Sequence, residues 1–333
     1  MNDLLIGLLS ALLTTNSVTA ASNAVKKATG ITVNAPDPND PVEKEYQKLL
    51  ADDDAAEEEV EKWMNDAQAF AEQGAGIPQA TLSLRIEERL KPVRAAYEDF
   101  LKRHPDHARA RLAYGSFLDD LGEDEGARDQ WEKARELDPK NPATWNNLAN
   151  YYGHRGPAKK AFEYYAKAIE LKPDESVYHR NLATTTYLFR KDAMEFYAID
   201  EQKVFDRALE LYRKALALDP ENFELAADRA QSYYGIKPSR VEEALGAWQD
   251  ALKIAKDDDA RQGVYIHLAR VEVSAARFDE ARQHLDQVSL EKYADLKRRV
   301  LRNLAQKEAK AKGADTSPDA AKESSPAPAP PKP

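Results

Sequence analysis

The stretch WNNLANYYGHRGPAKKAFEYYAKAIELKP, residues 145–173, carries the pattern that decides the fold. Its first half contains a large residue followed by a small one, Leu148–Ala149, and the small residue allows a second helix to approach closely. Its second half contains three residues at spacings of four and three, which fall on one helical face: Ala161, Tyr165 and Ala168. Pro173 ends the segment, because proline cannot continue a helix. The stretch is therefore predicted to fold as two packed helices.

The same pattern recurs at a period of 34 residues. Matching residue types stand 34 positions apart in several sets: Gly115, Ala149 and Ala183; Ala127 and Ala161; Trp131 and Tyr165; Ala134 and Ala168; Pro139 and Pro173. A fixed period of this length is typical of stacked two-helix units. The chain is therefore predicted to be one elongated repeat array rather than two ordinary domains.

These residues resemble the tetratricopeptide repeat (TPR) family. Within residues 145–173 eight signature positions are filled: Trp145, Leu148, Ala149, Tyr152, Ala161, Tyr165, Ala168 and Pro173. The preceding unit departs at Arg111, where the family has Trp, and the resemblance extends over roughly residues 79–290. It implies an all-α, right-handed superhelical solenoid of antiparallel helix pairs, with flanking helices at the N-terminal side and a capping helix at the C-terminal side.

The segments around the array differ in composition, and they suggest this organisation: an apolar N-terminal segment and Pro-rich linker over 1–40, acidic helices with a degenerate repeat over 41–104, the array over 105–290, a basic capping helix over 291–312, and a disordered Pro/Ala-rich tail over 313–333. A capping helix is expected because the last unit would otherwise expose its apolar face. The acidic and basic helices are predicted to pair, either within one chain or by weak self-association of two copies.

The N-terminal residues leave two interpretations open. Leu4 to Leu13 is apolar, and small residues follow at Ala20 and Ala21, as in a signal peptide. However, no Lys or Arg precedes Leu4. We expect a retained helix and a cytoplasmic protein; the alternative is export to the periplasm with residues 1–21 as the signal. No apolar run reaches the roughly 18 residues of a transmembrane span.

Composition excludes several kinds of function. The 333 residues include no Cys, which removes disulfides, thiolate nucleophiles and Cys-ligated metal centres. A net charge of −10 disfavours nucleic acid as a partner. No Gly-rich phosphate loop, Gly-x-Ser-x-Gly or His-Glu-x-x-His motif is present, and His104 and His107 lack further ligands at metal-binding spacing. We therefore expect no enzyme activity, no metal and no cofactor.

In this family the first helix of each unit lines a concave groove that holds a peptide of a partner protein. The positions that match in this chain are Asn146, Asn150, Arg180, Asn181, Thr184, Tyr187, Gln231 and Tyr234. The first four resemble part of the clamp by which some members hold a peptide C-terminal carboxylate. The Lys usual in that clamp is absent, and Asp119 and Asp228 fall on the same predicted surface. The sequence is therefore compatible both with a carboxylate clamp and with a general peptide groove.

The third unit contains an insertion at about residues 187–199. Ala183 and Ala208 are 25 residues apart, whereas Ala149 and Ala161 are 12 apart, so 13 residues are added. The segment is rich in aromatic residues and Asp200 is a good N-cap for the helix that follows. Its candidate contact residues are Phe189, Phe196 and Tyr197. They either form one wall of the groove or cover a gap between units.

Together these features predict a non-catalytic scaffold or adaptor that binds a peptide segment of a partner protein in the groove. The alternative, which depends on the N-terminal segment, is an exported or membrane-associated assembly or secretion factor of the cell envelope.

Overall fold

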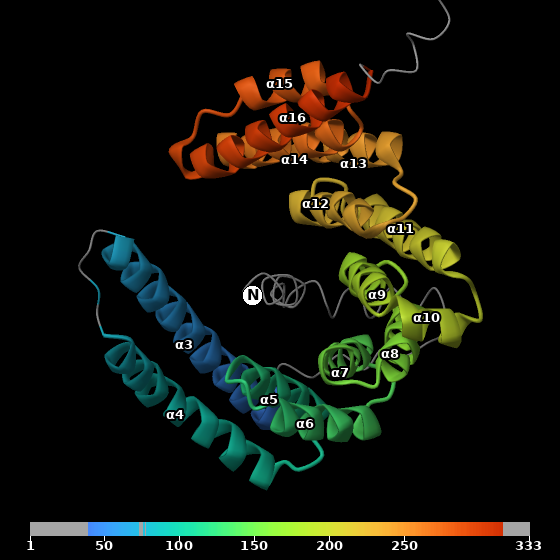
Figure 1. Ribbon diagram of the computed structural model, residues 1–333. Coiled ribbons are helices and arrows are strands. Elements are labelled where there is room, and N and C mark those ends of the chain that lie inside the picture. The colour runs from blue at the N-terminus through green and yellow to red at the C-terminus, as the bar shows by residue number, and fades with distance from the viewer. Residues whose placement is uncertain (1–38, 73–75, 77, 316–333) are drawn as a thin grey trace, which may run out of the picture. The chain divides into compact units, whose positions relative to one another are not determined.

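The computed structural model describes residues 39–72, 76 and 78–315, and every regular element in this part of the chain is a helix (Figure 1). The chain divides into two compact units, unit 1 ending at Asp138 and unit 2 beginning at Pro139. The boundary predicted between residues 104 and 105 lies inside unit 1. The apolar stretch at residues 4–13 and the tail beyond residue 315 lie outside the described residues. The predicted all-α repeat fold is confirmed for the described part.

Unit 1 consists of two long helices followed by a shorter hairpin. Their bounds are α3 Pro41–Glu72, α4 Gln79–Arg103, α5 Ala108–Asp120 and α6 Asp124–Leu137. Aromatic rings fill the core, where Tyr97 stacks on Tyr114 with ring centroids 5.2 Å apart. Gly115 of α5 lies directly against the indole of Trp131 of α6. The small and the aromatic residue of this repeat therefore pack together, as their spacing predicts.

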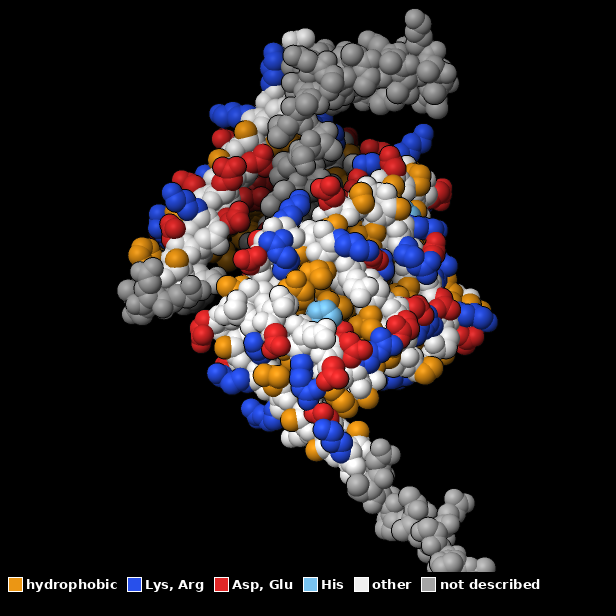
Figure 2. All heavy atoms as spheres, turned by 90° about the horizontal axis from the view of Figure 1, so that it is seen from above, with side chains coloured by type: hydrophobic (Ala, Val, Ile, Leu, Met, Phe, Trp, Pro, Cys, Tyr) orange, Lys and Arg blue, Asp and Glu red, His pale blue; other side chains and the backbone are white. Residues whose placement is uncertain are grey.

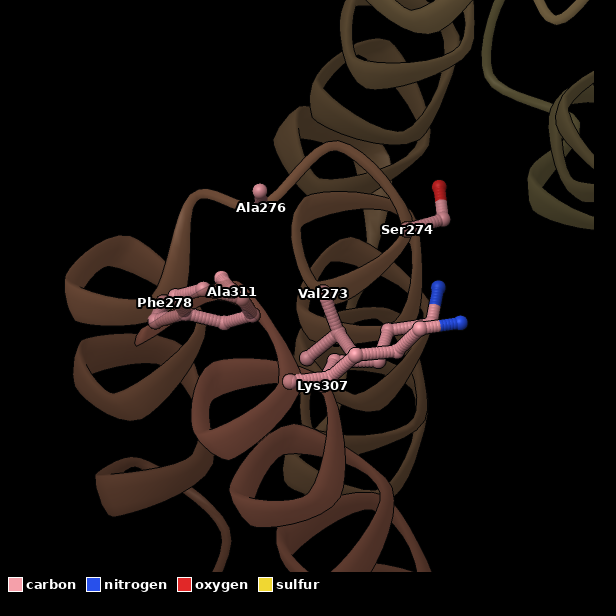
Figure 3. Close-up of a pocket in the computed structure, with 7 residues that line it drawn as sticks. Val273, Ser274, Ala276, Phe278, Lys307 and Ala311 are labelled. Atoms are coloured by element: carbon pink, nitrogen blue, oxygen red, sulfur yellow. The ribbon is translucent and has the colours of Figure 1, made fainter. Parts of the chain in front are cut away.

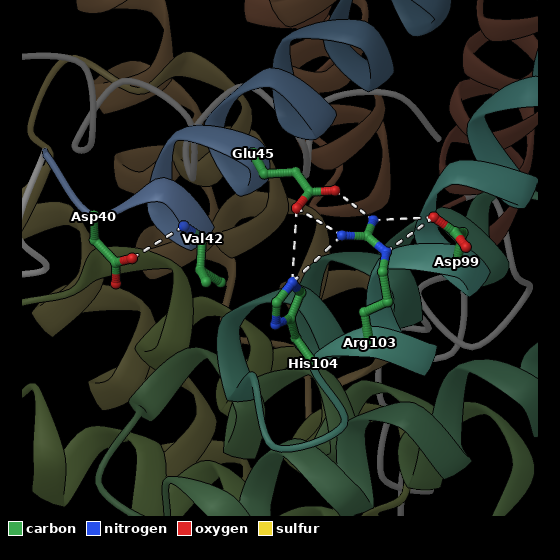
Figure 4. A network of polar contacts seen from close by, with 6 residues as sticks. All are labelled: Asp40, Val42, Glu45, Asp99, Arg103 and His104. Atoms are coloured by element: carbon green, nitrogen blue, oxygen red, sulfur yellow. Dashed lines mark hydrogen bonds and ion pairs between the residues drawn. The ribbon is translucent and has the colours of Figure 1, made fainter.

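A polar network ties the beginning of α3 to the end of α4 (Figure 4). Arg103 Nη1 donates to Oε2 of Glu45 at 2.8 Å, and its Nε donates to Oδ2 of Asp99 at 3.1 Å. His104 Nε2 lies 3.6 Å from the Glu45 carboxylate. Asp40 accepts a hydrogen bond from the backbone N–H of Val42 at 3.0 Å. Arg103 and Asp99 are exposed, and Glu45 and His104 are half-buried, so these contacts fix the helix ends and add little to stability.

Unit 2 consists of helical hairpins with one extra helix inside the second. The elements, in chain order, are α7 Pro142–Arg155, α8 Ala158–Leu171, α9 Ser176–Leu188, α10 Arg190–Tyr197, α11 Glu201–Leu218, α12 Phe223–Ser232, η1 Tyr233–Gly235, α13 Val241–Ile254, α14 Asp258–Ser274, α15 Phe278–Asp286, η2 Glu291–Tyr293 and α16 Ala294–Asp315. The first helices of the hairpins are α7, α9, α12 and α14; the second helices are α8, α11, α13 and α15.

Side chains at helix starts and signature positions explain this architecture. Asn141, Asn222 and Asp257 each accept a hydrogen bond from a backbone N–H in the first turn of the helix that follows. The N-cap predicted at Asp200 is confirmed, because its carboxylate accepts from Lys203 N at 2.9 Å. The signature alanines are fully buried, so the two helices of a hairpin touch closely.

The last helix covers the apolar face of the final hairpin. α16 contacts both α14 and α15, and it buries Val300 and Leu304 in a core with Leu285. Its other face is polar and exposed.

On the face of the molecule in Figure 2, Lys and Arg side chains alternate with Asp and Glu around scattered hydrophobic ones. This mixture is typical of a solvated surface rather than of a phosphate-binding patch.

The insertion folds as the short helix α10. It contacts α8, α9 and α11, and its Ala193 is fully buried. Ala198 ends it in the left-handed conformation, with φ of 52°. The segment is therefore a short helix packed against its neighbours.

Candidate functional site

The first helices of unit 2 contact one another in succession through polar and aromatic side chains. We call the surface formed by these contact residues the A-helix face; its residues lie on α7, α9, α12, η1 and α14 (Figure 1). It contains seven of the eight groove candidates: Asn146, Asn150, Arg180, Asn181, Thr184, Tyr187 and Tyr234. The eighth, Gln231, is an exposed residue of α12. The structure divides the seven into an asparagine cluster, an ion pair, a packed middle and an aromatic end.

Three asparagines join α7 to α9. Asn181 Nδ2 donates to Oδ1 of Asn146 at 3.0 Å and to Oδ1 of Asn150 at 3.3 Å. The Tyr165 hydroxyl also donates to Asn150 Oδ1, at 2.7 Å. Burial raises the pKa of Tyr165, so this phenol stays protonated and keeps its donor role.

These bonds determine which atoms of the cluster face outward. Asn146 is 3% exposed and therefore serves the fold. Asn150 is half-buried, and both of its bonds fall on the oxygen, which fixes the orientation of the amide. Among residues 39–72, 76 and 78–315, no acceptor lies within hydrogen-bond distance of Asn150 Nδ2. Two N–H donors on the A-helix face are therefore open to a ligand.

Arg180 and Asp228 form an ion pair between α9 and α12. The Arg180 Nε donates to Oδ2 of Asp228 at 2.8 Å, and Nη2 lies 2.7 Å from the same oxygen. The carboxylate of Glu224 is 3.8 Å from this guanidinium. Since an internal carboxylate already occupies the Arg180 fork, the geometry favours a general peptide surface over a clamp that holds a ligand carboxylate at this residue.

The middle of the A-helix face is packed. The hydroxyls of Thr184 and Tyr212 lie 2.8 Å apart. The Tyr187 ring packs on Phe205, and it lies so close to Gly235 that a Cβ there would be 3.0 Å from Cζ of the tyrosine. A Cβ at position 235 would force the Tyr187 phenol to shift, which is a reason for glycine directly after Tyr234. Tyr187 is thus largely structural.

An aromatic cluster forms the end of the face nearest α14. The Tyr234 hydroxyl lies 3.0 Å from Nδ1 of His267, and the His267 ring stacks on Trp248 with centroids 4.1 Å apart. Burial, and then the charge of Arg270, lower the pKa of His267 to about 4, so the imidazole is neutral near pH 7. The Arg270 guanidinium lies 4.8 Å from the centroid of the Tyr234 ring.

His267 and Arg270 are not among the groove residues predicted from the sequence, although the sequence contains a signal for Arg270. The residue that follows the small residue of each unit is a predicted groove position, as Asn150, Thr184 and Gln231 are after Ala149, Ala183 and Ala230. Arg270 follows Ala269 in the same way, 39 residues after Gln231. His267 carries no such signal, because its contacts with Tyr234 and Trp248 depend on how two hairpins stack.

The insertion residues lie away from this set. Phe196 and Tyr197 pack on Phe162 of α8 with ring centroids 5.4 and 5.6 Å away, and Phe189 joins the same cluster. The guanidinium of Arg207 covers the Tyr197 ring at 3.9 Å. Since α8 and α11 are second helices, these contacts favour a segment that covers a gap between hairpins over a wall of the groove.

We therefore predict that the double substitution Phe196→Ala/Tyr197→Ala lowers the free energy of unfolding by about 3–5 kcal/mol, because two half-buried rings leave a cavity. Urea unfolding followed by circular dichroism measures this change. The substitution Phe70→Ala, of an exposed ring on α3, is the control and is expected to change little. A variant of unchanged stability would show that the two rings are not part of the core.

A shallow hollow lies elsewhere in unit 2, between the end of α14 and α16 (Figure 3). Val273, Phe278 and Ala311 form its apolar surface, and the side chain of Lys307 lies beside Val273. It shares no residue with the A-helix face. Within the described ranges, no group of three or more His, Asp or Glu is arranged to hold a metal ion. No helix of the described part is long and apolar enough to cross a bilayer.

Comparisons with known proteins agree with the repeat pattern. A model of the tetratricopeptide repeat family matches residues 94–142 and 198–260, and a second tetratricopeptide repeat model matches residues 142–175. No curated protein matches the sequence.

Three solved structures are similar to this chain. The first, YrrB, "a TPR protein with an unusual peptide-binding site", is 15% identical with a TM-score of 0.48, over 62% of this chain and 98% of YrrB. The second, PilF of Pseudomonas aeruginosa, is 16% identical with a TM-score of 0.46, over 70% of this chain and 91% of PilF. The third, MamA, is 21% identical with a TM-score of 0.42, over 51% of this chain and 91% of MamA.

Proposed function

We propose, on the premise that this chain is a tetratricopeptide repeat protein, that it is a non-catalytic scaffold which binds a peptide segment of a partner protein along the A-helix face of unit 2. Protein interaction is the function of this repeat class. The peptide and its position on the A-helix face are our proposal.

The observation that carries the proposal is the open amide of Asn150. An extended peptide presents backbone carbonyls that need donors, and an Asn side chain can donate to them without selecting a particular side chain. Because Asn181 and Tyr165 hold the oxygen of Asn150, its Nδ2 group is already oriented when a peptide arrives. Such preorganisation lowers the entropic cost of binding.

The chemistry of the other side chains agrees with binding rather than catalysis. The A-helix face presents amides, hydroxyls, phenols and an ion-paired guanidinium, which form hydrogen bonds. The imidazole near Tyr234 is neutral, with its pKa lowered to about 4, which is far from the range of an efficient general base at pH 7.

The substitution Asn150→Asp tests the proposal, since it keeps the oxygen that accepts two internal bonds and replaces the two N–H donors by a second, negatively charged oxygen. A phage-displayed library of random 12-residue peptides would be selected on the full chain, and the affinities of the enriched peptides measured by fluorescence anisotropy. We expect the variant to bind them about 10-fold more weakly, the effect of one or two lost hydrogen bonds.

The matched control is Asn303→Asp, which makes the same charge change at an exposed residue of α16. This control is expected to leave affinity unchanged. A library that yields no enriched peptide, or peptides that bind Asn150→Asp and wild type equally well, would overturn the proposed function.

A further inference from the structure

Arg270 is an exposed cation at the aromatic end of the A-helix face, and it forms no ion pair within the part of the chain that the structure describes. Other arginines nearby are paired: Arg261 with Asp258, and Arg277 with Glu242. The charge of Arg270 is therefore available to a ligand.

Two acids of the same face do not compensate this charge. Glu224 and Asp228, which belong to the neighbouring first helix, both lie at Arg180, at 3.8 and 2.7 Å. His267 adds no second cation, because its imidazole is neutral near pH 7. The A-helix face thus has one uncompensated positive charge at this end, which is complementary to an anion.

A stack of rings holds this arginine in place. Trp248 is 1% exposed and supports the His267 ring, which in turn lies within hydrogen-bond distance of the Tyr234 hydroxyl. Tyr234, 37% exposed, offers its ring face to the guanidinium of Arg270. A cation–π contact of this kind restrains a planar fork that can bind a carboxylate through two parallel hydrogen bonds.

The position of Arg270 links it to the peptide surface. It occupies the same place in its unit as Asn150, Thr184 and Gln231 do in theirs. An extended peptide that meets the Asn150 amide and continues along the successive first helices therefore reaches Arg270 further along the same face.

We propose that Arg270 and Tyr234 form a subsite for a carboxylate of the bound peptide, so that the protein selects peptides with an acidic group at one defined position. This inference rests on the proposed function and adds the chemistry of the partner. The carboxylate comes either from an Asp or Glu side chain or from the peptide C-terminus. Both sources present the same planar anion to the arginine.

The test repeats the library selection on wild type and on Arg270→Glu, whose charge is reversed. We expect Asp or Glu to be enriched at one position on wild type, and Lys or Arg to replace it on the variant. For the best peptide, replacing the acid by its amide is expected to weaken binding to wild type about 10-fold or more, the usual worth of a charge-assisted pair. On Arg270→Gln, the acid and amide forms are expected to bind equally.

Two controls complete the experiment. Arg302→Gln removes an exposed arginine of α16 outside the A-helix face and is expected to keep the acid preference. Synthetic peptides that end in a free carboxylate or in a carboxamide distinguish the C-terminal source from the side-chain source. The preference is expected to weaken as salt rises.

The outcomes separate this inference from the proposed function. Peptides that depend on Asn150 but show no acid preference, or whose acid preference persists on Arg270→Gln, overturn the carboxylate subsite alone. A library that yields no enriched peptide on wild type overturns both.

Discussion

Replacing Gly115 by alanine is expected to lower the free energy of unfolding of unit 1 by about 2–4 kcal/mol, from overpacking and a lost hydrogen bond. A Cβ at this position would lie 2.5 Å from Cδ1 of Trp131, far inside contact distance. The indole cannot yield easily, because it is 2% exposed and its Nε1 donates to the carbonyl of Leu112 at 3.2 Å. Either α5 and α6 separate or the indole leaves its place.

The repeat itself supplies the compensating change. In the next unit the corresponding pair is Ala149 with Tyr165. Alanine is larger than Gly115, and tyrosine is smaller than Trp131. The double substitution Gly115→Ala/Trp131→Tyr should therefore be more stable than Gly115→Ala alone, and the two changes should be non-additive. Urea unfolding of the full chain, followed by circular dichroism, measures the free energy of unfolding of each single variant and of the double variant.

Gly246→Ala is the matched control for this experiment. Gly246 lies inside α13, and apart from its chain neighbours and the nearby backbone of its own helix no atom comes within 4 Å of the added Cβ. Alanine should therefore stabilise the helix there by about 0.5–1 kcal/mol. The same Gly→Ala substitution is then expected to lower the free energy of unfolding at Gly115 and to raise it at Gly246. If Gly115→Ala were neutral, close approach to Trp131 would not be the reason for glycine at this position.

The Gly115–Trp131 contact also shows how much of the fold is predictable from sequence. The repeat period, the pairing of helices and the burial of the small residues can all be predicted from the spacing of residues within one repeat. This is possible because every repeat packs its two helices through small and aromatic residues at the same positions. The same register identifies first-helix positions, and it applies to Arg270 as well as to Asn150. The N-cap at Asp200 is predictable for the same reason, because it depends only on residues next to it in the sequence.

Contacts between repeats are not predictable in this way. Arg180 looks like an open ligand group in the sequence, yet it pairs with Asp228, 48 residues later. Their unit positions place both residues on the same predicted surface, but they do not show that the two side chains pair. Whether Phe196 faces the groove or Phe162 likewise depends on how α10 turns back after α9.

Unit 1 is expected to lose stability as the pH rises from about 4 to 8, because desolvation raises the pKa of carboxyl groups on its helices. The pKa of Asp53 is raised to about 6, that of Asp120 to about 6 and that of Glu57 to about 8. A raised carboxyl pKa means that the folded state binds more protons than the unfolded state. The free energy of unfolding therefore falls as these groups ionise.

Asp53 gives the clearest magnitude, since it is 7% exposed whereas Glu57 and Asp120 are more accessible. Its Oδ2 accepts from the Tyr97 hydroxyl, but its Oδ1 is buried with no hydrogen-bond partner in the described structure, and Asp54 adds like charge. The rise from 3.8 to about 6 corresponds to about 3 kcal/mol, lost mainly between pH 4 and 6. Ionisation of Glu57 extends the loss toward pH 8.

Asp53→Asn isolates this contribution, because it keeps an oxygen acceptor for Tyr97 and cannot ionise. The difference in unfolding free energy between wild type and variant should shift by about 3 kcal/mol in favour of the variant as the pH goes from 4 to 7. Asp66→Asn, at an exposed acid of the same helix, should leave the wild-type profile unchanged. Parallel profiles for wild type and Asp53→Asn would mean that Asp53 ionises in the folded protein as readily as in the unfolded chain, and that its burial between α3 and α4 costs nothing.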